Sequence, residues 1–409
     1  MNTKIRFQLS LMMFLEFFIW GGWFVTLGTF LSNNIKANDG EIAMAFSTQS
    51  WGAIIAPFVI GLIADRYFNA ERILGVLHLL GAGLLYLMYT TTQFDLFYPY
   101  VLGYMILYMP TLALVNSISF NQMKDPAKEF SFVRVFGTTG WIVAGLVISY
   151  AFQWDSDIGI RKGLLKNTFL MTAIASGLLG VFSFTLPKTP PRADQTKKVS
   201  LAEILGLDAL KLLKDQNFLI FFIASILICI PLAFYYQNAN PFLVEVGLQN
   251  PTAKMTIGQG SEIVFMLLLP YFFTKFGFKN TILIAMLAWT IRYVLFAFGN
   301  TGELTFMLII GIALHGICYD FFFVSGQIYT DSKAGSKYKS AAQGLITLAT
   351  YGVGMLIGFW VAGRIADIYL NQDGTHTWQN IWLFPAVFAL LVLLYFALFF
   401  KKEKIAYKA

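Results

Sequence analysis

The feature that most constrains this chain is a series of long apolar runs separated by short polar loops. Roughly twelve runs can be counted, at about 7–32, 43–64, 73–92, 96–120, 132–152, 165–187, 217–238, 255–274, 280–299, 304–329, 339–366 and 379–400. A helix needs about 20 residues to cross the hydrocarbon core of a bilayer, and most of the runs have that length. The sequence therefore predicts an all-α membrane protein with twelve transmembrane helices.

The composition excludes several classes of function. Only 12% of the 409 residues are charged and 57% are hydrophobic, whereas about a quarter of a soluble protein is charged. The net charge of +7 comes from Lys and Arg in short loops, so no nucleic-acid partner is expected. Two cysteines inside apolar runs and three scattered histidines indicate neither a disulfide framework nor a metal site. No nucleotide-binding P-loop is present. We expect no enzyme, no cofactor and no ATP-driven pump.

The distribution of positive charge predicts the orientation in the membrane. Lys and Arg gather in alternate loops and at both ends of the chain, a bias that marks the cytoplasmic side. Arg161, Lys162 and Lys166 are a local exception on the opposite side. The first run is too long for a signal peptide and lacks a small-residue cleavage site, so it is expected to stay as a helix. Both termini are then cytoplasmic, in a multi-pass membrane protein.

One long polar loop, Pro187 to Gln216, divides the runs six and six. Within it, Ser200 to Leu213 has helical spacing and a capping pair, Ser200 with Glu203. The predicted organisation is an N-terminal six-helix bundle (1–187), a cytoplasmic linker with an interfacial helix (188–216) and a C-terminal six-helix bundle (217–409). This plan resembles the major facilitator superfamily.

The loop between the second and third runs reads GLIADRYFNAER and is similar to that superfamily's signature loop. There, glycine allows close helix approach, and the aspartate and arginine pair across the cytoplasmic gate. The resemblance implies a gating motif made of Gly61, Asp65, Arg66 and Arg72. The second half keeps only Pro270, Lys275 and Lys279 at the equivalent place.

Ionisable residues inside the tenth run point to a functional site. Asp320 lies with His315 and Tyr319 in an otherwise apolar stretch, 308–329. Buried charges are costly in a membrane and normally face a bundle interior or a water-filled path. At about 100° per residue, His315 and Tyr319 share a helix face with Asp320 toward its edge. This grouping suggests a site for a polar solute and a proton. The alternative is an acid that only holds helices together.

Other intramembrane polar residues extend this prediction. Glu16 lies near the middle of the first helix, and Glu262 has Gln259 on the same face of the eighth. A helix-packing hydrogen bond is the alternative role for Glu16. Arg134, Thr138 and Trp141 form one stripe along the fifth run; Arg134 could instead snorkel to the cytoplasm. His78, alone in its run, is expected to be structural.

Several blocks, taken together, resemble the nucleoside:H⁺ symporter family of the major facilitator superfamily over nearly the whole chain. They include WGGWFVTLGTF (20–30), YMPTLALVNSISF (108–120), RVFGTTGW (134–141), LGLDALKLLKD (205–215), QGSE (259–262), YDFFFVSG (319–326), SAAQG (340–344) and TWQNIWL from Thr377. The resemblance implies twelve helices and proton-driven nucleoside import by a central site. It implies substrate binding by Arg134, Thr138, Gln259 and Glu262, and it places Trp141 and Tyr319 at site positions where other members have different aromatic residues. His315 completes the set of predicted substrate-binding residues. Asp320 is the implied proton-linked acid, with Glu262 and Glu16 as further candidates.

The chain departs from the better-known family members at a few positions. His315 stands in place of a tyrosine, Ala233 and Tyr236 in place of binding amides, and Glu16 in place of a neutral amide. The base- and sugar-reading contacts are therefore partly changed. Two alternatives stay open: the same fold importing an amino sugar, a glycoside or a cell-wall fragment, and a membrane receptor or sensor without transport. We expect a monomer in the bilayer that takes a small-molecule substrate and protons.

Overall fold

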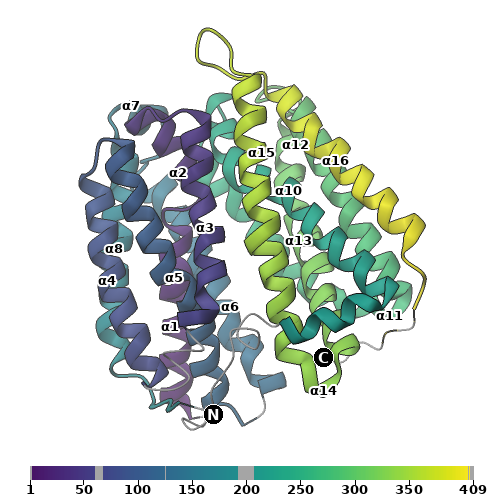
Figure 1. Cartoon of the computed structure of the whole chain (residues 1–409). Coiled ribbons are helices and arrows are strands. Elements are labelled where there is room, and N and C mark those ends of the chain that lie inside the picture. The colour runs from purple at the N-terminus through teal and green to yellow at the C-terminus, as the bar shows by residue number, and fades with distance from the viewer. Residues whose placement is uncertain (1, 60–67, 125, 192–206, 404, 406–409) are drawn as a thin grey trace. The chain divides into compact units, whose positions relative to one another are not determined.

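The computed structural model describes residues 2–59, 68–124, 126–191, 207–403 and 405 (Figure 1). Within these ranges the regular elements are helices, and the one β feature is an isolated bridge between Leu370 and His376. Nine helices in the described part are long and apolar enough to cross a membrane. The protein is therefore an all-helical, multi-pass membrane protein.

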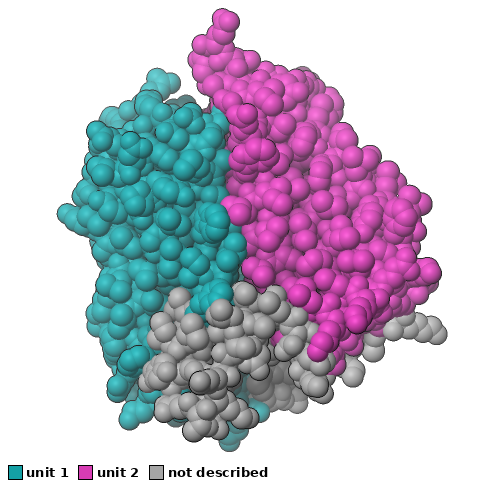
Figure 2. Space-filling view, in the orientation of Figure 1, with its two compact units in different colours: residues 1–199, 250–256 teal, residues 200–249, 257–409 magenta. Residues whose placement is uncertain are grey.

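The chain forms two compact units (Figure 2). Unit 1 comprises Met1–Val199 with Asn250–Thr256, and unit 2 comprises Ser200–Gln249 with Ile257–Ala409. The division into two bundles and a linker at 187 and 216 stays a prediction.

Unit 1 is a bundle of long helices with short helical segments between them. Its elements are α1 (Thr3–Gly21), α2 (Leu27–Phe30), a π-helix (Leu31–Ile35), α3 (Asp39–Val59), α4 (Ala70–Thr90), α5 (Phe94–Gln122), α6 (Pro126–Leu146), a π-helix (Val147–Ala151), α7 (Asp157–Arg161), a 3₁₀-helix (Leu164–Lys166) and α8 (Asn167–Ser183). Glycines bring these helices together, as small residues do between membrane helices. A Cβ on Gly140 of α6 would collide with the Phe14 carbonyl of α1, and one on Gly180 of α8 would lie 2.8 Å from Leu79 Cγ of α4.

Unit 2 has longer helices with internal breaks. Its elements are a 3₁₀-helix (Leu207–Lys214), α10 (Gln216–Glu245), most of α11 (Pro251–Phe298), α12 (Thr305–Ala313), α13 (His315–Tyr319), a π-helix (Asp320–Val324), α14 (Ser325–Thr347), a π-helix (Leu348–Gly354), α15 (Met355–Ile368) and α16 (Trp378–Phe399). Gly277 in α11 and Gly335 in α14 have positive φ angles of 75° and 62°. Only glycine adopts this conformation freely, so the chain turns at both places. The Gly277 turn separates the predicted eighth and ninth runs.

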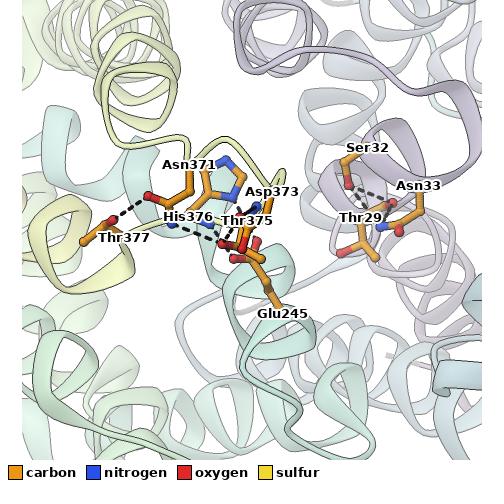
Figure 3. A network of polar contacts seen from close by, with 9 residues as sticks. All are labelled: Thr29, Ser32, Asn33, Glu245, Asn371, Asp373, Thr375, His376 and Thr377. Carbon is orange, nitrogen blue, oxygen red and sulfur yellow. Dashed lines mark hydrogen bonds and ion pairs between the residues drawn. The ribbon is translucent and has the colours of Figure 1, made fainter.

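A polar loop joins α15 to α16 in unit 2 (Figure 3). Glu245, the last residue of α10, accepts from the His376 backbone N–H at 2.6 Å and contacts His376 Nδ1 at 2.9 Å. Thr375 donates to Asp373 from its backbone N–H and its hydroxyl, and these bonds lower the pKa of Asp373. Figure 3 also shows a cluster in unit 1, where Asn33 donates to the Thr29 carbonyl and to Ser32 Oγ.

Two sequence predictions fall partly outside the described residues. Gly61, Asp65 and Arg66 of the gating motif lie there, as do Ser200 and Glu203 of the expected interfacial helix. Arg72 is described and is an exposed residue in the first turn of α4. The described end of the linker, Leu207–Lys214, is a 3₁₀-helix.

Candidate functional site

The tenth apolar run is not one regular helix in the structure. Its α-helical turns end at Ala313, resume as α13 over His315–Tyr319, and give way at Asp320 to a π-helical turn. Single π-helical turns inside membrane or soluble helices occur frequently at functional sites. Asp320 is 1% exposed and His315 is 2% exposed, while Tyr319 is half-buried. The irregular backbone therefore lies where the sequence places the acid and the imidazole.

Within unit 2, His315 lies between the carboxylate of Glu262 and the guanidinium group of Arg292. Its Nε2 lies 2.9 Å from Glu262 Oε1, and its Nδ1 lies 3.0 Å from Arg292 Nη1. A guanidinium group only donates, so Nδ1 must accept and carries no hydrogen. The hydrogen of the neutral ring is then on Nε2 and is donated to Glu262. Arg292 thus fixes both the tautomer and the neutral state of His315.

Aromatic rings surround this Glu262–His315–Arg292 triad. The Tyr235 ring lies 3.4 Å from Arg292 Cζ, and it stacks on His315 with 5.1 Å between ring centroids. Tyr319 follows one turn after His315, at 5.8 Å between centroids, and its hydroxyl is 2.5 Å from that of Tyr351. A cation over an aromatic face is favourable, more so when water is excluded. Unit 2 thus combines a carboxylate acceptor with ring faces.

The close approach of α11 and α13 places Glu262 beside His315. The Gly316 N–H donates to Ser261 Oγ at 2.9 Å, and a Cβ on Gly316 would lie 2.6 Å from the Ser261 carbonyl oxygen. Gln259, one turn before Glu262, is half-buried. The Glu262 side chain keeps 24% of its surface exposed, against 3% for His315. Glu262 is therefore the most exposed member of the triad.

The stripe on α6 lies within unit 1. Arg134, Thr138 and Trp141 are all half-buried. The Arg134 guanidinium carbon lies 4.2 Å from the centroid of the Phe17 ring on α1. Trp141 packs edge-on against Trp20 of α1, at 5.5 Å between centroids. The stripe therefore lies along the α1–α6 contact and offers a cation, a hydroxyl and an indole.

Glu16 has partners that the sequence did not predict. It is fully buried, and its Oε2 lies 2.8 Å from His78 Nε2. Its Oε1 is 2.6 Å from Thr111 Oγ1, and the Tyr108 hydroxyl donates to its backbone carbonyl at 2.8 Å. For Glu16 the sequence predicts either a part in proton coupling or a helix-packing hydrogen bond, and for His78 it predicts a structural role. In unit 1 these two residues contact each other.

Arg292 is the residue that sequence reasoning missed. It is fully buried in the middle of the ninth run, and its Nε and Nη2 have no hydrogen-bond partner among the described residues. The sequence does show this residue, because Arg292 is an arginine deep inside an apolar run. Ionisable residues inside membrane helices are rare and are usually functional. In the described part of the chain no group of His, Cys, Asp and Glu is arranged to hold a metal ion.

Comparison with known proteins decides the family. The model of the family described as "Nucleoside H+ symporter" matches residues 1–405. The chain belongs to this family of the major facilitator superfamily. It is therefore a membrane transporter and not an enzyme.

Individual relatives match along nearly the whole length. The xanthosine permease of Escherichia coli (strain K12) is 34% identical, with 99% of each chain covered. YegT, a candidate nucleoside transporter of the same strain, is 43% identical over 98% of this chain and 95% of its own length. The crystal structure of the nucleoside transporter NupG is 30% identical, with a TM-score of 0.87 over 98% of this chain and all of the NupG chain.

Proposed function

We propose that this chain is a proton-coupled importer of nucleosides that works by alternating access in a bacterial inner membrane. The observation that carries the proposal is the match of the symporter family model over residues 1–405. Full-length relatives named as a xanthosine permease and a nucleoside permease support the substrate class. The proposal includes twelve membrane-spanning helices in two six-helix halves, with both termini in the cytoplasm.

The substrate contacts in unit 2 follow from the chemistry of a nucleoside. Ribose hydroxyls need acceptors, and Glu262 has one carboxylate oxygen left after Oε1 takes the His315 hydrogen. Gln259 adds an amide one helical turn away, and Tyr319 offers a ring face to a base. A lost hydrogen-bond partner in a buried polar site costs about 1–3 kcal/mol, so a few such groups set both affinity and selectivity.

The α6 stripe in unit 1 contributes the complementary types of contact. Arg134 donates to carbonyl groups of a base or to sugar oxygens, Thr138 both donates and accepts, and Trp141 stacks. In the proposed cycle the gating motif residues Gly61, Asp65, Arg66 and Arg72 act in closing the cytoplasmic side.

Asp320 is the proposed carrier of the transported proton. It is 1% exposed, stands at the start of the π-helical turn and is followed by Phe321, Phe322 and Phe323. A buried carboxyl group inside a membrane is costly when charged, so its protonation depends on the charges near it. Coupling requires that substrate binding and proton binding each change the affinity for the other.

Uptake in whole cells tests the proposal. Cells that lack their own nucleoside permeases would express the protein and receive labelled uridine or adenosine, with and without a protonophore. We expect uptake above the empty-vector control and its collapse when the protonophore is added. Uptake that ignores the protonophore would contradict proton coupling. A thermal-shift panel of nucleosides against amino sugars then identifies the cargo, with stabilisation expected from nucleosides.

A further inference from the structure

We propose that Glu16 and His78 form a second proton-binding site, in unit 1, that is loaded and unloaded in each transport cycle. The inference rests on the proposed proton-coupled function. It adds a second transported proton to the one that we propose for Asp320. Its starting observation is a fully buried carboxyl group in contact with a buried imidazole, 2.8 Å apart.

The protonation of the His78 ring can be deduced from its neighbours. Ser176 Oγ donates its only hydrogen to the His78 backbone carbonyl at 2.9 Å, because a carbonyl can only accept. The same Oγ lies 3.0 Å from His78 Nδ1. Since the hydroxyl hydrogen is already used, Oγ must accept there, and Nδ1 must carry a hydrogen. The second ring nitrogen, Nε2, is then the one that is free to gain or lose a proton.

The contact between His78 and Glu16 requires such a proton. With Nδ1 protonated, a neutral ring has a bare lone pair on Nε2, which faces Glu16 Oε2 at 2.8 Å. Two lone pairs at that distance repel, so one proton must lie between them, bound either to the ring or to the carboxyl group. The geometry therefore records the loaded form of the pair. The unloaded form has one proton fewer and must separate these two atoms.

The surroundings of the pair contain few other charges. Glu16 is 0% and His78 is 2% exposed. From α5, Tyr104 and Tyr108 lie near Glu16, and Arg134 of α6 interacts electrostatically with Tyr108. The contacts from Thr111 on α5 and Ser176 on α8 are hydroxyl groups, which do not titrate in this range. Loading and unloading therefore change the charge of a site that has little else to compensate it.

A chain of rings connects the pair to the proposed substrate contacts of unit 1. The Tyr108 hydroxyl binds the Glu16 carbonyl, and its ring lies 5.6 Å from that of Trp20. Trp20 lies 5.5 Å from Trp141. Separation of Glu16 from His78 would displace this packed series, and a substrate stacked on Trp141 would act on the same series. This is the physical route by which the second proton would be coupled to substrate.

Proton counting on the purified protein tests the site without any substrate. The protein in detergent would be taken from pH 8.5 to pH 5.5, and bound protons would be measured for the parent and for Glu16→Gln. Glutamine keeps the volume and an acceptor oxygen but cannot release the shared proton. We expect the parent to take up about one proton more per molecule than Glu16→Gln. Equal uptake would overturn the proposal, because the pair would then be a fixed structural contact.

The reversal condition of transport tests whether that proton moves with substrate. Proteoliposomes with a tenfold uridine gradient, and with the membrane potential clamped at zero, would be titrated to the pH difference that stops net flux. Each proton carried contributes a factor of about ten per pH unit. We expect a balance near 0.5 unit for the parent, which means two protons, and near 1 unit for Glu16→Gln. The same balance point in both would overturn the second proton.

Further variants distinguish loss of the shared proton from an unspecific effect of a substitution on the fold. His78→Gln, alone and combined with Glu16→Gln, should give the same balance point as Glu16→Gln, because one shared proton is lost only once. Glu71→Gln is the matched control, since Glu71 is a buried carboxylate of unit 1 that binds the Thr189 N–H and the Asn69 amide. It should keep the parent's balance point. If the parent accumulates no uridine at any pH difference, the proposed function fails, while proton counting still decides the pair.

Discussion

At the scale of single residues, two buried histidines that both lie in apolar runs have different hydrogen-bond partners. His315 receives a hydrogen bond from Arg292 and is therefore held neutral, with its hydrogen directed at Glu262. His78 has different neighbours, with the Ser176 hydroxyl at Nδ1 and the Glu16 carboxyl group at Nε2. Burial alone does not distinguish the two histidines, since both are 2% exposed. Their neighbours are the reason that we propose a proton-binding role for His78 and not for His315.

Loss of a substrate contact should weaken binding without loss of the fold. We expect Gln259→Ala and Arg134→Ala to lower nucleoside affinity by about 1–3 kcal/mol, or roughly 5- to 150-fold. Isothermal titration with the purified protein measures this, and protein yield reports on folding. Thr139→Ala is the control on α6, because the Thr139 hydroxyl is already bonded to the Val135 carbonyl. Normal binding by either variant would remove that residue from the site.

Neutralising the proposed proton carrier should separate binding from coupling. Asp320→Asn imitates the permanently protonated acid at nearly the same volume. We expect this variant to bind substrate and to exchange it across the membrane, but not to accumulate it against a gradient. Counterflow and pH-driven accumulation in the same proteoliposomes measure the two properties. Glu262→Gln and Glu16→Gln would be measured beside it, and full accumulation by Asp320→Asn would show that another acid has this role.

At the scale of helices, small residues and interrupted turns position the site. The spanning helices could be predicted from sequence because each needs about 20 mostly apolar residues to cross the hydrocarbon core of the membrane. Breaks inside the runs could not be read in the same way. The π-helical turn at Asp320 is such a break inside the tenth run. The turn at Gly277, by contrast, lies between the predicted eighth and ninth runs. The Glu16–His78 pair joins residues 62 positions apart, and no periodicity reports such a contact.

The contact of α13 with α11 should not tolerate a side chain at Gly316. A Cβ there would lie 2.6 Å from backbone atoms of Ser261, so Gly316→Ala should destabilise the protein by about 1–3 kcal/mol. Gly260→Ala on α11 is the matched control, because nothing lies within 4 Å of its added Cβ. It should be neutral or stabilising by up to about 1 kcal/mol. Thermal unfolding in detergent compares them, and equal melting temperatures would contradict the close approach.

The start of α10 should show a pH-dependent stability. Burial raises the pKa of Asp215, but hydrogen bonds from the Phe218 N–H and the Lys333 ammonium group lower it by a larger amount. The pKa of Asp215 is therefore below its usual value of 3.8. A lowered pKa means that the carboxylate stabilises the fold above pH 3.8 and that this contribution is lost as the pH falls through the folded-state pKa. Asp215→Asn keeps the helix cap and removes the charge.

Melting temperatures of the parent and Asp215→Asn between pH 8 and 2 measure this contribution. We expect the parent to melt higher at neutral pH and the difference to close only below pH 3.8, as the pH falls through the folded-state pKa. The gain should be small, because 45% of the Asp215 side chain is exposed and the pair is screened by solvent. A difference that stays constant down to pH 2 would show that charge has no part in it.

At the scale of the whole molecule, the family and the class of transport were predictable from sequence, and the detailed site was not. Apolar runs, the lack of soluble-protein charge and several motif blocks led to the symporter family, which the full-length match confirms. Arg292 was overlooked, and its bond to His315 changes how His315 acts. The substrate and proton assignments of Arg134, Gln259, Glu262 and Asp320 stay predictions. Contacts between residues of the protein do not show which of them bind a solute or a proton.

Accumulation in proteoliposomes driven only by a pH difference is the strictest test of proton-coupled nucleoside transport by this protein. Purified protein would be reconstituted into vesicles with an alkaline interior, with the potential clamped, and labelled uridine added outside. We expect uridine to accumulate inside to several times the outside concentration, and this accumulation to be lost when the pH difference is collapsed and to be absent from protein-free vesicles. Uridine that only equilibrates, with the same time course at every pH difference, would contradict proton-coupled nucleoside transport.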